Sequence, residues 1–105
     1  MITKDIAIYR GDDYTLEVAL LDSDGVPADL KSAEVKLAFC DSMGDDLRYA
    51  GIIINDNTVS ATFSHALTKD IEWSAGKYDL QVTMADGRVS TPVKGKIKMI
   101  QDVTP

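Results

Sequence analysis

The stretch that decides the fold runs Lys77-Tyr78-Asp79-Leu80-Gln81-Val82-Thr83-Met84. Its apolar residues take every second position and polar residues take the positions between. A period of two is typical of a β-strand with one buried face. The dipeptide Asp86-Gly87, which follows after Ala85, favours a tight two-residue turn. The segment therefore predicts a strand that turns back into a partner strand over about residues 88–101.

The same alternation recurs along the chain, separated by turn residues at intervals of roughly ten positions. Seven strands are expected, over about residues 3–9, 14–21, 34–40, 48–54, 58–63, 78–84 and 88–101. Residues 64–71 are the only helical candidate, with Ser64 as its cap, and they allow about two turns at most. The pattern predicts one all-β domain over residues 1–105, a two-sheet antiparallel β-sandwich of Ig-like plan with one short helical turn.

Composition narrows the classes of function. The chain has 105 residues, 45% of them hydrophobic, and a net charge of −6. An acidic surface repels phosphate backbones, so we expect no nucleic-acid partner. No apolar run approaches the ~18 residues of a membrane span, and the first residues do not resemble a signal peptide. The single cysteine cannot form an intramolecular disulfide, which fits synthesis and folding in a reducing cytoplasm.

The residues that enzymes and metal sites use are sparse. His65 is the only histidine and Cys40 the only cysteine, too few donors for a zinc site of that kind. No nucleophile elbow accompanies His65. Cys40 has no evident basic neighbour and is expected to be a small, semi-buried residue. Asp22-x-Asp24-Gly25 resembles the start of a calcium loop, but Ala33 occupies the position that requires a glutamate. We expect no enzyme, cofactor or bound metal.

Five residues are candidates for contact with a partner. Lys94, Lys96 and Lys98 alternate with apolar residues and should line one face of the last strand, either solvated or against a partner. Trp73 precedes a strand, where an aromatic ring usually plugs one end of the core. Trp73 and Tyr49 would instead be the rings to examine if the domain stacked against a sugar.

Two segments carry a resemblance to a known group of proteins. Ser74-Ala75-Gly76-Lys77-Tyr78-Asp79-Leu80-Gln81-Val82-Thr83 is continued by Ala85-Asp86-Gly87-Arg88-Val89-Ser90-Thr91-Pro92-Val93-Lys94-Gly95-Lys96-Ile97. With Ile8-Tyr9-Arg10-Gly11-Asp12-Asp13 near the start, the loop 25–30, and Asp102-Val103-Thr104 at the end, they resemble small β-sandwich proteins of tailed bacteriophages and prophages. Related domains form the N-terminal parts of baseplate or receptor-binding proteins.

The shared residues are mainly turn and core residues: the resemblance assigns Gly76 and Gly87 to turns, and Tyr78 and Leu80 to the core. The chain departs from the common pattern at Trp73-Ser74, where a Leu-Pro pair is usual, and at Met84-Ala85, where Thr-Asp is usual. We expect no receptor-binding extension after the domain.

The resemblance implies a bacteriophage virion structural or accessory protein of the tail, neck, baseplate or head surface. Such a protein acts by attachment to other virion proteins, as a homo-oligomer fixed by the symmetry of the particle, after synthesis in the host bacterial cytoplasm. The alternative is a carbohydrate- or receptor-binding module of a phage tail. No nucleic acid and no membrane are expected as partners.

Overall fold

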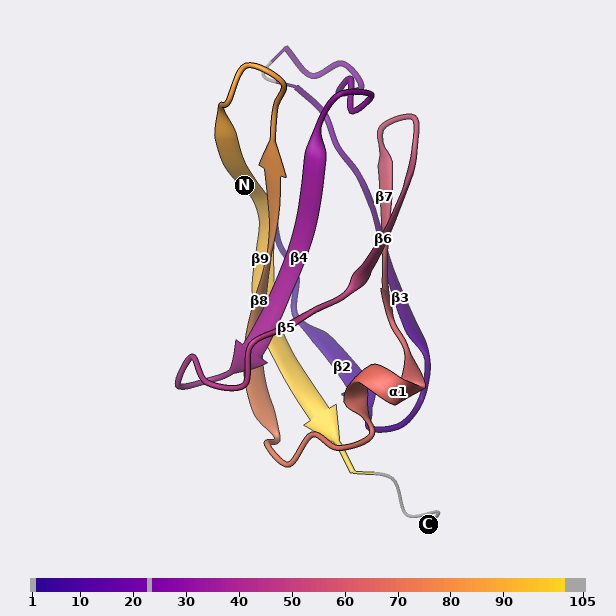
Figure 1. Cartoon of the computed structure of the whole chain (residues 1–105), viewed down its shortest axis with the longest axis vertical. Helices are drawn as coiled ribbons and strands as arrows, with labels where there is room; N and C mark the ends of the chain where they lie inside the picture. Colours follow the sequence, from indigo (N-terminus) through magenta and orange to yellow (C-terminus); the bar gives the residue numbers. More distant parts are fainter. Residues whose placement is uncertain (1, 23, 102–105) are drawn as a thin grey trace.

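Two β-sheets lie face to face in the computed structural model, which describes residues 2–22 and 24–101 (Figure 1). The large sheet contains β1 (Ile2–Thr3), β2 (Ile6–Tyr9), β9 (Val89–Ile100), β8 (Ala75–Thr83), β4 (Glu34–Asp41) and β5 (Arg48–Tyr49). The small sheet has the order β3 (Tyr14–Ala19), β7 (Thr58–Phe63) and β6 (Gly51–Asn55). The expected all-β sandwich is confirmed.

The described residues form nine strands because two of the seven expected strands are each divided in two. The first is interrupted at residues 4–5, between β1 and β2. The fourth is divided at the buried Ala50, where the chain leaves the large sheet after β5 and enters the small sheet as β6 (Figure 1). Residues 48–54 were expected as one strand, and nothing in their sequence indicates that the two halves pair with different partners.

The strand order is that of an immunoglobulin sandwich. β3, β7 and β6 correspond to strands B, E and D, and β4, β8 and β9 to strands C, F and G. β1 and β2 both pair in parallel with β9, whereas the other strand pairings of the described residues are antiparallel. The first and last strands of the sequence are therefore neighbours in the large sheet.

The core lies between the sheets and is filled by the inward residues of both. Phe39 of β4 and Phe63 of β7 meet edge to face with ring centroids 4.9 Å apart, and Tyr14 packs against Phe63 at 6.0 Å. Edge-to-face geometry is the arrangement that the ring quadrupoles favour. All four apolar positions of the deciding stretch face inward, and three of them, Tyr78, Leu80 and Val82, are buried as the alternation predicts.

Gly76 corrects the expectation that it forms a turn, because it lies within β8. A β-carbon there would come within 2.5 Å of both the carbonyl oxygen of Cys40 and the ring of Trp73. The glycine is thus required by the close approach of the indole. Trp73 is half-buried and packs against the core, as expected of a ring that plugs one end of the sandwich.

The turn between β8 and β9 also differs from expectation. The Met84 N–H donates to the Arg88 carbonyl and the Gly87 N–H to the Met84 carbonyl, so the loop has three residues and Gly87 takes a φ of 90°. This is the three-residue hairpin loop with a bulge. A second irregularity lies between Leu80 and Val82, opposite the segment that contains Pro92. A bulge accommodates a proline that lacks an N–H for the ladder.

The short helix α1 (His65–Thr68) is held by the turn over residues 10–13. Ser64 occupies its N-cap position, but its side chain makes no capping hydrogen bond. Asp13 caps the helix instead, because its Oδ1 accepts the His65 N–H at 2.7 Å. The Gly11 N–H donates to the Oγ1 of the buried Thr68. Within the described ranges, no helix has the length and apolar character needed to cross a membrane.

Candidate protein-contact surface

The outer face of the large sheet carries a group of exposed lysines. Lys94, Lys96 and Lys98 of β9 point outward, while Val93, Ile97 and Met99 point into the core, so the expected alternation is confirmed. Lys77 of β8 lies directly opposite Lys96 as its Cα partner. Lys77, Lys94, Lys96 and Lys98 are here named the lysine face. Lys77 was not among the candidates taken from the sequence.

Like charges directly opposite each other across two strands destabilise a sheet. Within residues 2–22 and 24–101, the structure records no ion pair for any of the four lysines. Asp79 is the Cα partner of Lys94 and brings one negative charge near. Asp5 lies beside the face, where its Oδ1 accepts the Lys96 N–H at 2.9 Å. The two carboxylates leave the positive charge of the face in excess.

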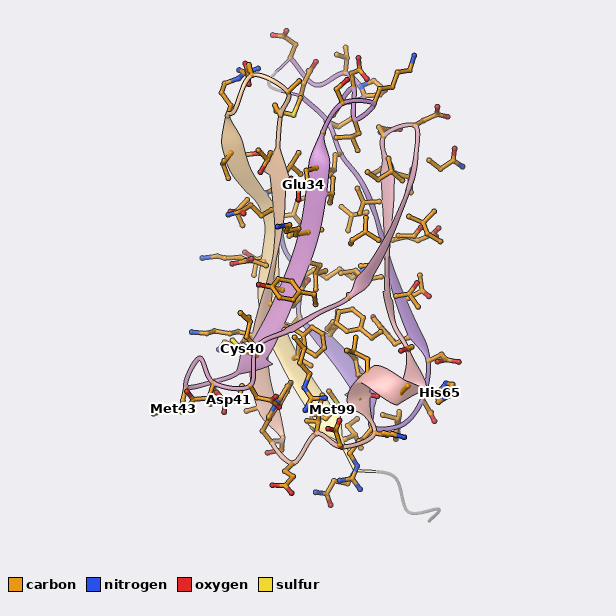
Figure 2. All side chains as sticks on the ribbon, in the orientation of Figure 1. Glu34, Cys40, Asp41, Met43, His65 and Met99 are labelled. Atoms are coloured by element: carbon orange, nitrogen blue, oxygen red, sulfur yellow. The ribbon has the colours of Figure 1, made fainter. Side chains whose placement is uncertain are left out.

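A shallow hollow of about 720 Å³ lies within this face, and Lys77, Lys94 and Lys96 line it. Cys40 lines the same hollow near the end of β4 (Figure 2). It is a free thiol and 9% exposed, as expected of a semi-buried residue. Its Cα partner on β8 is Lys77. The register of β4 against β8 brings the two together, although they are far apart in sequence.

Tyr49 lies on the same side of the large sheet, at the opposite edge. It pairs with Ala38 across β4 and β5, and 56% of its surface is exposed. It lines a separate hollow of about 380 Å³ together with Lys36. The aromatic ring is therefore available to a partner, and β4 lies between it and the lysine face.

Trp73 belongs to a different group of residues. Its Nε1 donates to the Asp46 carboxylate at 3.0 Å. Asp46 also accepts from Arg48, which donates to Asp70 at 2.6 Å and to the Leu67 carbonyl at 2.8 Å. Trp73 and Tyr49 line different hollows, so the structure does not join them into one aromatic platform. The Arg48 guanidinium ties β5 to the end of α1.

These hydrogen bonds shift the ionisation of the acidic residues. The Arg48 guanidinium holds the pKa of Asp46 and of Asp70 below the usual range. The pKa of Asp13 is lowered first by the His65 N–H and then by the His65 ring, whose Nδ1 is 3.0 Å away. His65 itself lies on the outside of α1 at the start of the helix (Figure 2). The His65–Asp13 pair thus helps to fix a helix terminus.

The carboxylate of Asp22 is satisfied locally. Asp22 Oδ1 accepts the N–H groups of Asp24 and Val26, which is how an aspartate stabilises a turn. Among the residues that the structure describes, no three histidine, cysteine, aspartate or glutamate side chains gather in an arrangement suited to a metal ion.

The fold and this surface define a β-sandwich of immunoglobulin-like order with a basic outer face. A scan against models of known protein families finds none that matches the chain. A search of curated protein sequences finds no significant match either.

Proposed function

We propose that this protein is a structural or accessory component of a bacteriophage virion, located in the tail, neck, baseplate or head surface. It works by attachment to other virion proteins. The resemblance of its strands and turns to small phage β-sandwich proteins supports the assignment to a virion. The lysine face supports attachment to another protein as the mode of action.

The observation that carries attachment is the Lys77–Lys96 pair. These side chains extend from adjacent strands on one exposed face of a protein whose net charge is −6. Repulsion between the two lysines destabilises the isolated domain. An acidic surface placed over them offsets this repulsion. Charge complementarity of this kind fixes the orientation of a contact and excludes wrong partners. The partner is thus a neighbouring virion protein with a carboxylate-rich surface.

Mass spectrometry of purified particles tests the virion assignment. The particles come from the bacterial strain that carries the gene, after induction or infection. We expect the chain at a fixed ratio to the major tail or head proteins through a density gradient. If the chain is abundant in the lysate and absent from banded particles, the assignment is wrong.

Charge reversal tests the contact surface separately. Lys77→Glu combined with Lys96→Glu should reduce incorporation into particles at least about tenfold, the loss of affinity expected for about 1.4 kcal/mol. The matched control combines Lys31→Glu with Lys69→Glu, which makes the same change of net charge at two exposed residues away from the face. Equal incorporation of the two double variants would remove the lysine face from the proposal.

A further inference from the structure

Two Asp-Gly pairs, Asp24-Gly25 and Asp86-Gly87, lie in turns of the same kind. The turns are here named the Asp24 turn, which begins at Asp22, and the Asp86 turn, which begins at Met84. In each turn the N–H of the first residue donates to the carbonyl of the fifth at 2.8 Å. The glycine N–H donates to the carbonyl of the first residue, at 3.0 Å and 2.9 Å respectively. Both glycines have a positive φ, 79° and 90°, so the two turns form a matched pair.

The first residue of each turn decides which groups the following aspartate carboxylate can bind. The first residue of the Asp24 turn is itself an aspartate, and its Oδ1 accepts the N–H groups of Asp24 and Val26. Met84 has no such acceptor, so the equivalent N–H, that of Arg88, donates to Asp86 Oδ1 at 3.0 Å. The Arg88 Nε donates to Asp86 Oδ2 at 2.7 Å. Both oxygens of the Asp86 carboxylate are therefore held in place.

The carboxyl group of Asp24 is not held in this way. Within residues 2–22 and 24–101, the structure records no hydrogen bond or ion pair for it. The position that corresponds to Arg88 is occupied by Val26, which has no side-chain donor and whose N–H already donates to Asp22. Asp24 is exposed, so its carboxyl group can rotate about the side-chain bonds.

We infer that Asp24-Gly25 is a site of spontaneous isomerisation, at which the folded chain converts Asp24 to isoaspartate while Asp86 is protected. The reaction begins when the main-chain nitrogen of Gly25 loses its proton and attacks Cγ of the Asp24 carboxylic acid. A bond forms between this nitrogen and Cγ, and the hydroxyl group leaves Cγ as water. The product is a five-membered succinimide ring.

Water then opens the ring at either of its two carbonyl carbons. Attack at Cγ breaks the new bond and restores aspartate. Attack at the main-chain carbonyl carbon of Asp24 breaks the original peptide bond, so the chain runs through Cγ and the former main-chain carbonyl becomes the free carboxylate. One water is lost and one is taken up, so isoaspartate has the mass of aspartate, and the reaction needs neither an oxidant nor an enzyme.

The difference between the two sites lies in the carboxyl group, because the nitrogens are alike. Both belong to glycines, and a β-carbon added at either glycine would meet no atom within 4 Å. At Asp86, however, the hydrogen bonds from Arg88 must break before the carboxyl group can turn towards the nitrogen. Ring closure also needs the protonated acid, since its hydroxyl leaves as water. The Arg88 N–H, and then the charge of its guanidinium, hold the pKa of Asp86 below its usual range, which slows the reaction further.

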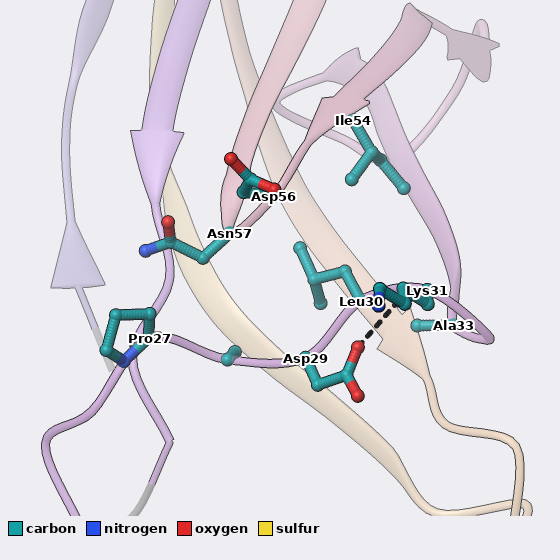
Figure 3. A pocket seen from close by; sticks show the side chains of 9 residues that line it. Pro27, Asp29, Leu30, Lys31, Ala33, Ile54, Asp56 and Asn57 are labelled. Atoms are coloured by element: carbon teal, nitrogen blue, oxygen red, sulfur yellow. Dashed lines mark hydrogen bonds between the residues drawn. The ribbon is translucent and has the colours of Figure 1, made fainter.

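The surroundings of the Asp24 turn can accommodate the methylene group that isomerisation adds to the main chain. The turn lies at one end of the sandwich, between β3 and β4 (Figure 1). Leu21 and Pro27 on either side of it form an isolated bridge. Pro27 lines an open hollow of about 420 Å³ together with Leu30 and Ile54 (Figure 3). The change therefore alters an exposed loop and leaves the packed core in place, and it does not depend on the proposed function.

Peptide mapping of the aged full chain tests the inference. The protein is kept for weeks in mildly acidic buffer, where part of the carboxyl groups is protonated. Trypsin then releases residues 11–31 and residues 78–88, each with one Asp-Gly pair. Isoaspartate peptides are resolved by chromatography and confirmed with an isoaspartate-specific methyltransferase. We expect isoaspartate at Asp24 to form at least about threefold faster than at Asp86, the ratio for an exposed contact of modest strength.

An exchange of the two residues that follow the glycines tests the cause. Val26→Arg supplies the guanidinium that Asp24 lacks and should slow isomerisation there. Arg88→Val removes it from Asp86 and should accelerate isomerisation at that site. Trypsin does not cleave before Pro27, so the first peptide stays whole in the Val26→Arg variant. Urea unfolding establishes that both variants are folded.

The urea-unfolded wild type is the matched control, because it retains both Asp-Gly pairs and loses the hydrogen bonds of the turns. There the two rates should approach each other. Equal rates at the two sites of the folded chain, or faster reaction at Asp86, would overturn the inference. So would an absence of isoaspartate at Asp24 in the folded chain while the unfolded chain forms it. An unchanged rate at Asp86 in Arg88→Val would equally contradict protection by Arg88.

Discussion

The carbonyl oxygen of Lys4 occupies the space where a β-carbon on residue 95 would lie, and Gly95, which has no β-carbon, makes this close approach possible. The Tyr78 hydroxyl donates to the same carbonyl, while the Lys4 N–H donates to the Lys94 carbonyl at 2.9 Å. Residues 4–5, which interrupt the first expected strand, are thus fixed against β8 and β9. The N-terminal segment is held by this contact as much as by its own strand pairing.

Gly95→Ala should therefore destabilise the protein. The methyl group would push against main-chain atoms, which cannot rotate away as a flexible side chain can. Forced overpacking of this kind costs about 1–3 kcal/mol. Gly51→Ala is the control, because its added carbon would lie 3.8 Å from the Thr62 carbonyl oxygen, an ordinary contact. Urea unfolding curves measure both, and equal midpoints would contradict the assignment.

Tyr78→Phe isolates the hydrogen bond from the packing. The ring of Tyr78 is buried and remains in place, so the variant loses only the hydroxyl that Lys4 accepts. We expect a loss of about 1 kcal/mol in the free energy of unfolding, the usual net value of such a bond. Tyr49→Phe, at an exposed ring, should change it by less than about 0.5 kcal/mol. If Tyr78→Phe leaves the free energy of unfolding unchanged, the Lys4 carbonyl accepts a hydrogen bond from water instead.

Arg48→Ala should cost more stability than Arg88→Ala, which removes an exposed ion pair. Arg48 is mostly covered and donates to the Leu67 carbonyl as well as to two carboxylates. Its loss should cost about 1–3 kcal/mol, because donors to charged groups and to a main-chain carbonyl disappear together. Arg88→Ala removes an exposed pair with Asp86 and should cost at most about 1 kcal/mol. Thermal unfolding of both variants gives the comparison. Equal losses of stability would show that the Arg48 cluster stabilises the protein no more than an exposed ion pair does.

Stability should fall on the acid side of pH 4 because several carboxyl groups have lowered pKa values in the folded protein. Asp13, Asp46 and Asp70 bind protons less readily when folded than when unfolded. Their contribution is therefore complete above the unfolded pKa of about 3.9 and is lost as the pH falls through the lower folded values. Urea midpoints measured from pH 7 to about pH 2.5 should follow this course.

Asp13→Asn provides the control for this loss of stability at acid pH. The amide oxygen can still accept the His65 N–H, so the helix cap remains while the titration is removed. The variant should lose less stability between neutral and acid pH than the wild type. An unchanged loss of stability at acid pH would mean that the pKa of Asp13 is the same in the folded and unfolded chains.

The alternation of residues was sufficient to predict the all-β class, the inward residues of β8 and the outward lysines of β9. Alternation reports which face a residue occupies and says nothing about which strand lies beside it. That is why the crossing at Ala50 and the parallel pairing of β2 with β9 were not predicted. Both depend on contacts between segments far apart in the sequence.

The pairing of Lys77 with Lys96 could have been predicted from the sequence. A two-residue turn at Asp86-Gly87, extended back along both strands, also pairs residue 77 with residue 96. The actual loop is one residue longer, and the irregularity between Leu80 and Val82 restores that pairing. The opposition of Lys77 and Lys96 was thus predictable from the position of the turn.

The parallel pairing of β2 with β9 has a kinetic consequence. Ile6 pairs with Ile97 and Ile8 with Met99, so β2 cannot complete its pairing until β9, far along the chain, has been made. Contacts between such distant segments slow folding, and we expect milliseconds to seconds instead of microseconds. On the ribosome, strands β3 to β8 can emerge and collapse before β9 exists. β2 joins the large sheet only when β9 is present, although it leaves the ribosome before β3 to β8.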